Sequence, residues 1–380
     1  MKSKVKIFLA AFLFVCMSVR AQGDGTLSEI TVKGSKMTVC SLNKLKSNTV
    51  TIPLSSLVEN CTLVQLETSS EAYFKPWFTT VTDKYIGVRQ QGGNPYKLFD
   101  RSGKFLCNIG SVGRGPGEYS ISLYDDIIDD KNGLIYLASM NGDRILVYNV
   151  SGKFVKDIVA PHQLKKPKMF LADNILTVVH MAFRDDKAIA LQFDVNTGQI
   201  LKELVPPAHL LSQNFDGEIF NTRNTTDIFD FYHTSSDTLY HFDAKNNKIQ
   251  PLFTMTYSSS EKPWKQYFQL NKDLFLTNVM GKGLVASDLK NKTSSYIKVV
   301  NDYYGNLPAP TYIMQLRNGY WAYNIQPEDL MEVIEKRLAE SSCTENDRQI
   351  LKKLNSTLKE GANNVVFIGK LKSGVQTKLF

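Results

Sequence analysis

An eight-residue segment that occurs twice constrains the fold more than any other feature of this chain. Residues 148–155 read Tyr-Asn-Val-Ser-Gly-Lys-Phe-Val, and they match residues 99–106, Phe-Asp-Arg-Ser-Gly-Lys-Phe-Leu, without a gap. In each copy an alternating apolar run ends in an aromatic residue and an Asp or Asn, and a turn containing glycine follows. Apolar runs that alternate with tight turns are typical of antiparallel β-strands.

The ending of this segment recurs beyond the two clearest copies. An Asp or Asn closes an apolar run at five positions, spaced by 49, 45, 49 and 45 residues: Asp100, Asn149, Asp194, Asp243 and Asp288. The acidic or amide side chain can accept hydrogen bonds from the turn, and glycine adopts positive φ there without steric cost. A period of this length with about four short strands is typical of the blades of a β-propeller.

The length of the chain sets the number of blades. The stretch from Thr49 to Asn324 holds about six repeats of this period, although only five are visible in the sequence. We therefore expect the sixth blade to combine strands from residues 50–67, 312–323 and 365–371. A blade built from both ends of the chain would close the ring and remove its free edges.

A helical hairpin is predicted over residues 327–360, before the final strand. Pro327 suits a first helical turn, Thr344 with Asp347 resembles a capping box, and Gly361 is a suitable stop. Apolar residues recur at helical spacing in both segments: Leu330, Ile334 and Leu338, then Ile350, Leu351, Leu354 and Leu358. The favoured interpretation is a lid that packs on apolar surface of the ring, and the alternative is a docking element for a partner.

These patterns predict an all-β fold, a six-bladed β-propeller with four-stranded antiparallel blades and a C-terminal helical hairpin insertion. The predicted division is a signal peptide at 1–21, an N-terminal leader at 22–48 with one short strand at Glu29–Val32, and the propeller at 49–380. We expect a monomer.

The first residues have the pattern of a secretion signal. A basic start precedes an apolar run from Ile7 to Met17, which is too short to span a bilayer, and cleavage is expected after Ala21. The mature chain would be secreted or periplasmic. The alternative is a lipid anchor on Cys16, against which the bulky Val15 argues. No second apolar run is long enough for a transmembrane segment in the mature chain.

Charge and cysteine content exclude two classes of function. Residues 1–21 carry four basic residues and no acid, so their removal lowers the formal charge from +8 to +4, and nucleic acid is not an expected partner. The basic run at residues 165–168 is interpreted as a solvated turn. Cys40, Cys61, Cys107 and Cys343 form no zinc-binding spacing. One or two disulfides remain open, although Cys61 and Cys107 are better explained as reduced core residues.

One loop carries a resemblance to a known family. After the first repeat, residues 113–119 read Gly-Arg-Gly-Pro-Gly-Glu-Tyr. This sequence resembles that of the six-bladed β-propellers found in secreted and lipid-anchored proteins of the Bacteroidetes, which are similar in form to NHL-repeat propellers. The resemblance covers the chain from about Thr49 to its end. It implies a fold and a compartment, and it implies no particular activity.

The same loop supplies candidate ligand-binding residues. It lacks the following helix and the Lys-Ser/Thr pair of a phosphate-binding P-loop. It can be explained as a connection between blades whose path requires glycines. Because loops on a rigid scaffold often bind ligands, Arg114, Glu118 and Tyr119 remain candidates.

Other candidates lie near the predicted starts and turns of blades. Arg89, Arg114, Arg144 and Arg184 would suit an anionic or sugar ligand at the mouth of the ring, unless they only bridge adjacent blades. His180 and His233 lie about one blade apart and form the best pair for a site assembled between blades, although hydrogen-bonded structural histidines are the favoured interpretation. The acids at 125–126 and 129–130 lack the EF-hand spacing and are interpreted as turn residues. No metal and no cofactor are predicted.

The favoured function is binding of a small molecule, a glycan or an envelope protein at one face of the ring. No Gly-x-Ser-x-Gly elbow is present, and no other catalytic constellation is evident. The first alternative is an enzyme centred on the channel, a lyase or glycan hydrolase with or without a metal. The second is a structural subunit of an envelope complex that docks through the helical hairpin.

Overall fold

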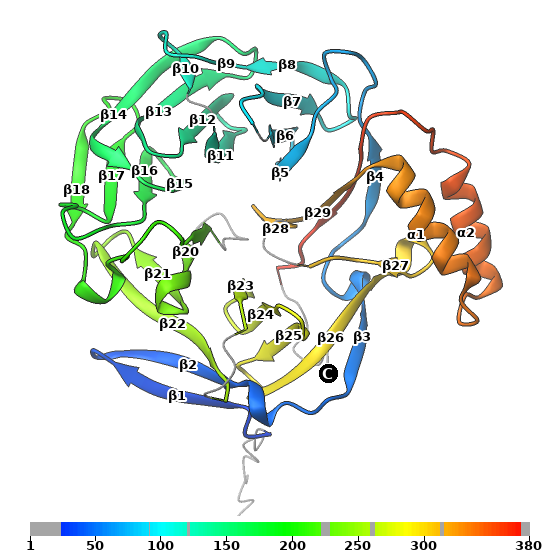
Figure 1. Ribbon diagram of the computed structural model, residues 1–380. Coiled ribbons are helices and arrows are strands. Elements are labelled where there is room, and N and C mark those ends of the chain that lie inside the picture. Colours follow the sequence, from blue (N-terminus) through cyan, green and yellow to red (C-terminus); the bar gives the residue numbers. More distant parts are fainter. Residues whose placement is uncertain are drawn as a thin grey trace, which may run out of the picture.

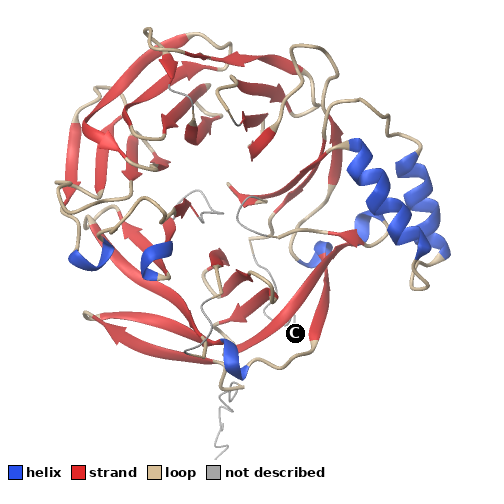
Figure 2. Ribbon diagram, in the orientation of Figure 1, coloured by secondary structure: helices blue, strands red, loops and turns tan. Residues whose placement is uncertain are grey.

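Six small β-sheets stand around a common axis and form a closed ring (Figure 1). The computed structural model describes residues 24–90, 92–119, 122–221, 229–258, 263–311 and 315–373. The predicted signal peptide and Cys16 lie outside these ranges. The six-bladed propeller predicted from the repeat is confirmed, and strands dominate the ring while the two α-helices lie together at its rim (Figure 2).

The first three blades are four-stranded antiparallel sheets. From the axis outward, the first blade comprises β5 (Pro76–Val81), β6 (Tyr85–Gln90), β7 (Tyr96–Asp100) and β8 (Phe105–Ile109). The second comprises β11 (Leu123–Asp129), β12 (Leu134–Ser139), β13 (Gly142–Asn149) and β14 (Phe154–Leu164). The third comprises β15 (Lys168–Ala172), β16 (Ile175–Val179), β17 (Ala190–Asp194) and β18 (Ile200–Leu204). Between the first two blades lies a short parallel pair, β9 (Ser111–Val112) and β10 (Glu118–Tyr119).

The fourth and fifth blades are lengthened at their outer edges. They comprise β19 (Ile219–Asn221), β20 (Asp230–His233), β21 (Thr238–Asp243) and β22 (Lys248–Thr256); and β23 (Lys265–Asn271), β24 (Leu274–Val279), β25 (Gly283–Asp288) and β26 (Thr293–Asn301). The added strands are β1 (Leu27–Val32), β2 (Ser35–Ser41), β3 (Thr49–Pro53) and β27 (Leu307–Pro308). β2 and β3 pair in parallel with β22 and β26. The leader, for which the sequence predicted one short strand, thus contributes a hairpin to the fourth blade.

The sixth blade joins the two ends of the chain. Its strands are β28 (Leu316–Arg317), β29 (Tyr320–Ile325), β30 (Val365–Lys370) and β4 (Thr62–Gln65). The N-terminal strand β4 pairs antiparallel with the C-terminal β30, and Val64 lies opposite Val366. The predicted closure is therefore confirmed. Because the ring cannot open without breaking this ladder, the closing blade holds all six blades together.

The five repeated Asp and Asn residues have one structural role. Each is the last residue of the third strand of its blade. The side-chain oxygen of Asp100 accepts a hydrogen bond from the Ser102 N–H at 2.8 Å, and that of Asn149 accepts one from the Ser151 N–H at 3.1 Å. Gly103, with φ of 92°, completes the first of these turns. The repeat in the sequence is therefore a repeated turn that ends each third strand.

Apolar side chains fill the space between neighbouring blades. Val147 of the second blade packs in one buried cluster with Leu176 and Leu191 of the third, and other blade pairs share similar clusters. In the closing blade Trp321 is fully buried, and its indole N–H donates to the carbonyl of Pro310 at 2.6 Å. Burial of side chains of this size contributes about 1.5–3 kcal/mol each. The core is thus divided among the interfaces between blades.

The predicted hairpin consists of α1 (Pro327–Ala339) and α2 (Glu345–Asn355). The capping box of Thr344 and Asp347 is present, and Gly361 has positive φ. Leu330, Ile334, Leu351 and Leu354 are buried in the same cluster as the closing blade. The hairpin therefore covers apolar surface of the ring, as the favoured interpretation predicted.

Two further features are the state of the cysteines and the character of the helices. Cys40, Cys61, Cys107 and Cys343 are all unpaired, so the structure contains no disulfide among them. Within the described ranges, neither α-helix has the length and the apolar character needed to cross a bilayer.

Candidate functional site

Charged and aromatic side chains converge on the ring axis from the innermost strands of four blades. Phe78 and Thr79 come from β5, Asp125 from β11, Lys168 from β15 and Arg317 from β28. Each of these strands is the first of its blade, and blades repeat by rotation about the axis. The starts of these strands therefore lie on one face of the ring.

Two arginines and two aspartates form a buried network at this place. The Nε of Arg89 lies 2.6 Å from the Oδ1 of Asp126, and only 1% of the Arg89 side chain is exposed. The guanidinium of Arg317 contacts the Oδ1 of Asp125 at 2.7 Å and the Oδ1 of Asp126 at 3.3 Å. Each arginine thus has an acidic partner, as buried charges require.

The remaining carboxylate oxygens are also satisfied. The hydroxyl of Tyr96 donates to the Oδ2 of Asp126 at 3.0 Å, and the backbone N–H of Met169 donates to the Oδ2 of Asp125 at 2.7 Å. Burial would raise the pKa of Asp126, but the charges of Arg317 and Arg89 hold this pKa below its ordinary value. Both aspartates are therefore fixed as acceptors within the network.

Lys168 is a third cation of the site and has no such partner. Its ammonium donates to the carbonyl of Tyr124 at 3.0 Å and lies 4.2 Å from the centre of that ring. Glu218, the next acid, pairs instead with Lys166 at 2.5 Å. Among the described residues no carboxylate forms an ion pair with Lys168. Burial lowers the pKa of Lys168 to about 7, although Asp125 opposes this effect.

A small cavity of about 20 Å³ lies among these cations. It is lined by Arg89, Lys168 and Arg317 together with Asp125 and by Phe78, Thr79, Phe220 and Asn221. The Nε of Arg317 is buried and has no hydrogen-bond acceptor among the described residues. The volume suits one water molecule or one small anion. Three cations face two carboxylates, so the cavity favours negative charge when Lys168 is protonated.

Aromatic rings frame the same region. Trp77 lies 6.1 Å from Tyr124 between ring centres, and Phe220 contacts Trp264 edge to face at 6.0 Å. Trp264 is 40% exposed. A ligand with a flat or apolar body could therefore pack on these rings while its charged group approaches the cavity.

The predicted arginines occupy different environments. Arg89 belongs to the network at the axis. Arg114 and Arg184 are exposed, and Arg144 forms surface ion pairs with Asp143 at 3.0 Å and Asp157 at 2.8 Å. The structure thus brings one of these four arginines to the channel.

The glycine-rich loop is held together by its own predicted candidates. The Oε2 of Glu118 accepts a hydrogen bond from the Gly115 N–H at 2.7 Å. Tyr119 is buried, donates its hydroxyl to the Ile109 carbonyl at 3.0 Å and accepts from the Tyr96 N–H at 2.8 Å. Both side chains therefore shape the connection between the first two blades, whereas the nearby Arg114 projects to solvent.

The predicted histidine pair does not meet. His180 faces His162, with 3.2 Å between the two Nε2 atoms, and His233 lies near Ser236. Burial lowers the pKa of both His180 and His233 to about 4. In the part of the chain that the structure describes, no three His, Cys, Asp or Glu side chains are grouped as metal ligands.

Two interpretations of charged segments were wrong. Asp125 and Asp126 lie within β11 and are buried, whereas Asp129 does accept hydrogen bonds in the following turn. In the basic run at 165–168, Lys166 and Lys168 are buried at 6% exposure, so this run is not a solvated turn. Arg317 was missed because its strand has only two residues. Charged residues within the apolar first strands of two blades, Asp125 and Asp126 in β11 and Lys168 in β15, are the signal that could have found this network.

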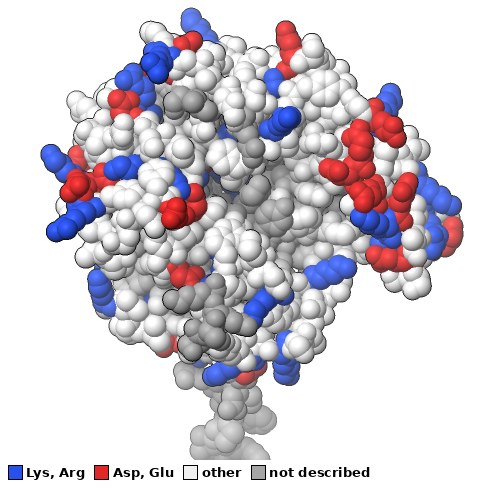
Figure 3. All heavy atoms as spheres, in the orientation of Figure 1, with Lys and Arg blue, Asp and Glu red and all other residues white. Residues whose placement is uncertain are grey.

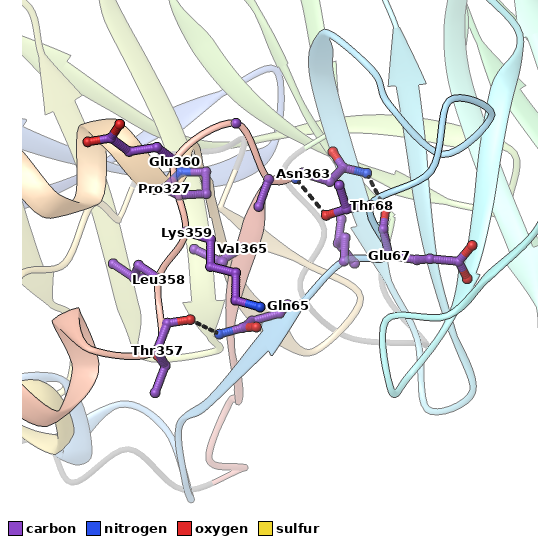
Figure 4. Close-up of a pocket in the computed structure, with 13 residues that line it drawn as sticks. Gln65, Glu67, Thr68, Pro327, Thr357, Leu358, Lys359, Glu360, Asn363 and Val365 are labelled. Atoms are coloured by element: carbon purple, nitrogen blue, oxygen red, sulfur yellow. Dashed lines mark hydrogen bonds between the residues drawn. The ribbon is translucent and has the colours of Figure 1, made fainter.

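A second hollowed region lies between the helical hairpin and β4 (Figure 4). The Gln65 amide donates to the Thr357 carbonyl at 3.0 Å, and cavities of about 500 and 600 Å³ share these two residues. The larger cavity is lined mainly by apolar and aromatic residues: Leu63, Tyr303, Tyr304, Ile350 and Leu354. Acidic side chains gather on the hairpin side in Figure 3, where the exposed acids of α1 are Glu328, Asp329, Glu332 and Glu335. We call this region the hairpin cleft.

The fold and the axial network define a six-bladed β-propeller with a charged centre and a rim hairpin. Comparison with known families gives the particular group, because residues 37–370 match the domain of unknown function DUF4934. The chain belongs to this family. No match to the sequence was found among curated proteins.

A solved structure from Bacteroides has a similar fold. A candidate exported protein of Bacteroides fragilis is 14% identical, with a TM-score of 0.56, and the match covers 86% of this chain and all of the other. A member of the DUF4221 family from Bacteroides vulgatus is 12% identical, with a TM-score of 0.46 and coverage of 83% and 98%. At 14% identity the likeness to the Bacteroides fragilis protein shows the fold alone. The finer resemblance to NHL-repeat propellers stays a prediction.

Proposed function

We propose that this protein is an exported propeller that binds a ligand carrying a carboxylate or a similar anionic group at the ring axis. The observation that carries the proposal is Lys168, a buried cation beside a small cavity, which has no ion-pair partner among the described residues. Export is supported by the sequence pattern of residues 1–21 and by the similarity to a candidate exported protein.

The physical argument concerns the cost of an uncompensated charge. A buried ammonium without a counter-ion is unfavourable, and the lowered pKa of Lys168 expresses this cost. An anionic group near Lys168 and the free Nε of Arg317 would offset it. Because the cavity is about 20 Å³, it would take a single ion or the terminal oxygen atoms of a ligand group. The rest of the ligand would lie against Trp77, Phe220 and Trp264.

The test compares charged and neutral probes of the same shape. Sodium glucuronate and acetate would be titrated calorimetrically into the mature chain, with glucose and acetamide as uncharged counterparts. We expect the anionic probes to bind and Lys168→Met to weaken them at least tenfold. Arg184→Gln, at an exposed position, is the matched control and should leave binding unchanged. Equal binding to wild type and Lys168→Met, or preference for neutral probes, would contradict the proposal.

A catalytic alternative uses the same residue. Lys168 has a pKa of about 7, which suits a general base in a lyase. Asp125 and Asp126 are less suited to proton transfer because arginines hold them as ion pairs. Prolonged incubation with a polyuronate would distinguish the two hypotheses. Formation of the unsaturated product by wild type but not by Lys168→Met would establish catalysis, whereas saturable binding without product supports a binding protein.

The role of structural subunit in an envelope complex has separate support in the hairpin cleft and in the exposed acids of α1. This role would require a partner with basic or aromatic groups. It predicts that Ile350→Glu in the cleft weakens capture of a purified envelope partner without changing glucuronate binding. Unchanged capture by Ile350→Glu would contradict this role.

A further inference from the structure

Two histidines of neighbouring blades face each other on the propeller. His162 belongs to the outermost strand of the second blade, β14, and His180 directly follows β16 of the third. Their Nε2 atoms are 3.2 Å apart, and the ring centres are 5.2 Å apart. His180 is fully buried, whereas His162 is only half-buried. Solvent can therefore reach the pair from the side of His162.

The surroundings of His180 fix which of its nitrogens carries the proton. Its Nδ1 lies 3.2 Å from the Met181 carbonyl, which can only accept a hydrogen bond. The Nδ1–H therefore donates to this carbonyl, and the lone pair of Nε2 points toward His162. A backbone carbonyl that orients one ring nitrogen while the other is left as a lone pair is the usual support of a metal-binding histidine.

The distance between the two Nε2 atoms discriminates among kinds of metal coordination. Zinc binds imidazole nitrogen at about 2.0–2.1 Å, so two ligands at a tetrahedral angle stand about 3.3 Å apart. A linear two-coordinate ion would require about 4 Å between them at the same bond length. The observed 3.2 Å fits the tetrahedral arrangement without movement of either ring.

We propose that His162 and His180 bind a divalent transition-metal ion, with Zn²⁺ as the best match to the donor set and spacing. Among the described residues no third His, Cys, Asp or Glu completes a ligand group. The other coordination positions therefore belong to water or to an external ligand, and the site is open and exchangeable rather than a closed structural centre.

The electrostatic surroundings agree with such a site. Burial lowers the pKa of both His162 and His180, which keeps them neutral and able to ligate at pH 7. Asp186 brings a negative charge close to both rings, but its carboxylate is held by Lys165 at 2.6 Å and by the Phe183 N–H at 2.8 Å. Because Lys165 also places a positive charge near both rings, the pair leaves little net charge there, and the Asp186 carboxylate is not available as a ligand. The proposal is independent of the anionic ligand at the axis.

The experiment uses the full mature chain after removal of metal with a chelator. Calorimetric titration with ZnCl₂ should show one equivalent bound with micromolar affinity, and His162→Gln should weaken it at least tenfold. His209→Gln is the matched control, because His209 is also accessible to solvent and its side chain, within the described ranges, contacts Lys33 at 3.1 Å and the Tyr240 ring. Thermal unfolding would verify that each variant is folded.

A second readout examines the ligands directly. Pulsed electron paramagnetic resonance of the Cu²⁺-loaded protein should detect two imidazole nitrogens in wild type and one in His162→Gln. The proposal is overturned if the wild type takes up no zinc at one equivalent. It is equally overturned if His162→Gln binds as tightly as the wild type, which would reveal adventitious surface binding.

Discussion

The ring axis and the hairpin cleft differ in the charge and in the volume of their cavities. At the axis, Arg89, Arg317 and Lys168 surround a cavity of about 20 Å³. Between the hairpin and β4 lie cavities of about 500 and 600 Å³, and the larger one is lined mainly by apolar and aromatic groups. The axis thus offers strong charge and little space, and the cleft offers space and little buried charge. A propeller can place a small, charge-selective site at its axis and a larger binding cavity at its rim because the blades and the rim insertions are separate elements.

The largest expected effect is the loss of a shared acid at the axis. Asp126→Asn would leave Arg89 and Arg317 without one carboxylate, and breaking a buried ion pair costs about 3–5 kcal/mol. Urea unfolding should therefore show a decrease of this size in the free energy of unfolding. The matched control is Asp143→Asn, which removes an exposed partner of Arg144 and should cost less than about 1 kcal/mol. Equal losses in the two variants would contradict the importance of the axial network.

Acid should destabilise the ring through its buried histidines, whereas residues 327–360 contain no histidine. The pKa of buried His180 and His233 falls from the ordinary 6.5 to about 4. The unfolded chain therefore binds protons first, and stability is lost as pH falls from about 6.5 toward 4. Each histidine accounts for at most about 3 kcal/mol of this loss.

Unfolding measured at pH 7 and pH 4.5 would test this dependence. His233→Gln should reduce the difference between the two pH values, and His241→Gln is the control because Asp230 raises the pKa of His241. An unchanged difference in His233→Gln would show that other groups cause the acid sensitivity.

Anion binding at the axis should weaken as pH rises through about 7. Only protonated Lys168 attracts an anion, and burial places its pKa near this value. Affinity for glucuronate should therefore fall about tenfold for each pH unit well above the pKa of the complex. Calorimetry at pH 6 and pH 9 measures the effect, and Lys168→Met should bind weakly at both. An affinity for glucuronate that does not change with pH would show that Lys168 does not bind the anion.

The smallest effect is expected in the hairpin cleft. The Leu63 N–H donates to the Tyr304 hydroxyl at 3.0 Å, so Tyr304→Phe removes one hydrogen bond while keeping the ring. The free energy of unfolding should fall by about 0.5–1.5 kcal/mol, and glucuronate binding should not change. A loss from Tyr304→Phe as large as that of Asp126→Asn would erase the contrast between the two regions.

Much of the fold follows from local patterns. The turn that ends each third strand uses a short-range hydrogen bond, so Asp100 and Asn149 could be recognised with their neighbours alone. The hairpin was predictable for the same reason, since the Thr344 cap and its apolar stripe are contained within a few helical turns. The second leader strand β2 was missed because its parallel pairing with β22 is a contact between distant segments.

The candidate site was harder to predict because it depends on where each strand lies in the ring. Lys168 in a basic run resembles a surface residue until β15 is known to be the innermost strand of its blade. Asp125 and Asp126 resemble turn residues for the same reason. Arg89 was among the predicted residues, but its partner Arg317 comes from the opposite end of the chain. The turns could therefore be predicted because they depend on residues that are close in sequence. The residues of the axial site could be recognised only once the arrangement of the strands in the closed ring was known.

The most direct test of the account is the titration of Lys168 itself. In the mature chain with ¹³C-labelled lysine side chains, the Lys168 signal would be assigned by its loss in Lys168→Met and followed from pH 5 to pH 11. We predict a pKa of about 7 without ligand, and a rise in this pKa when sodium glucuronate is added. A Lys168 pKa near the ordinary 10.5, or one that does not respond to the anion, would contradict a charge-selective site at the ring axis.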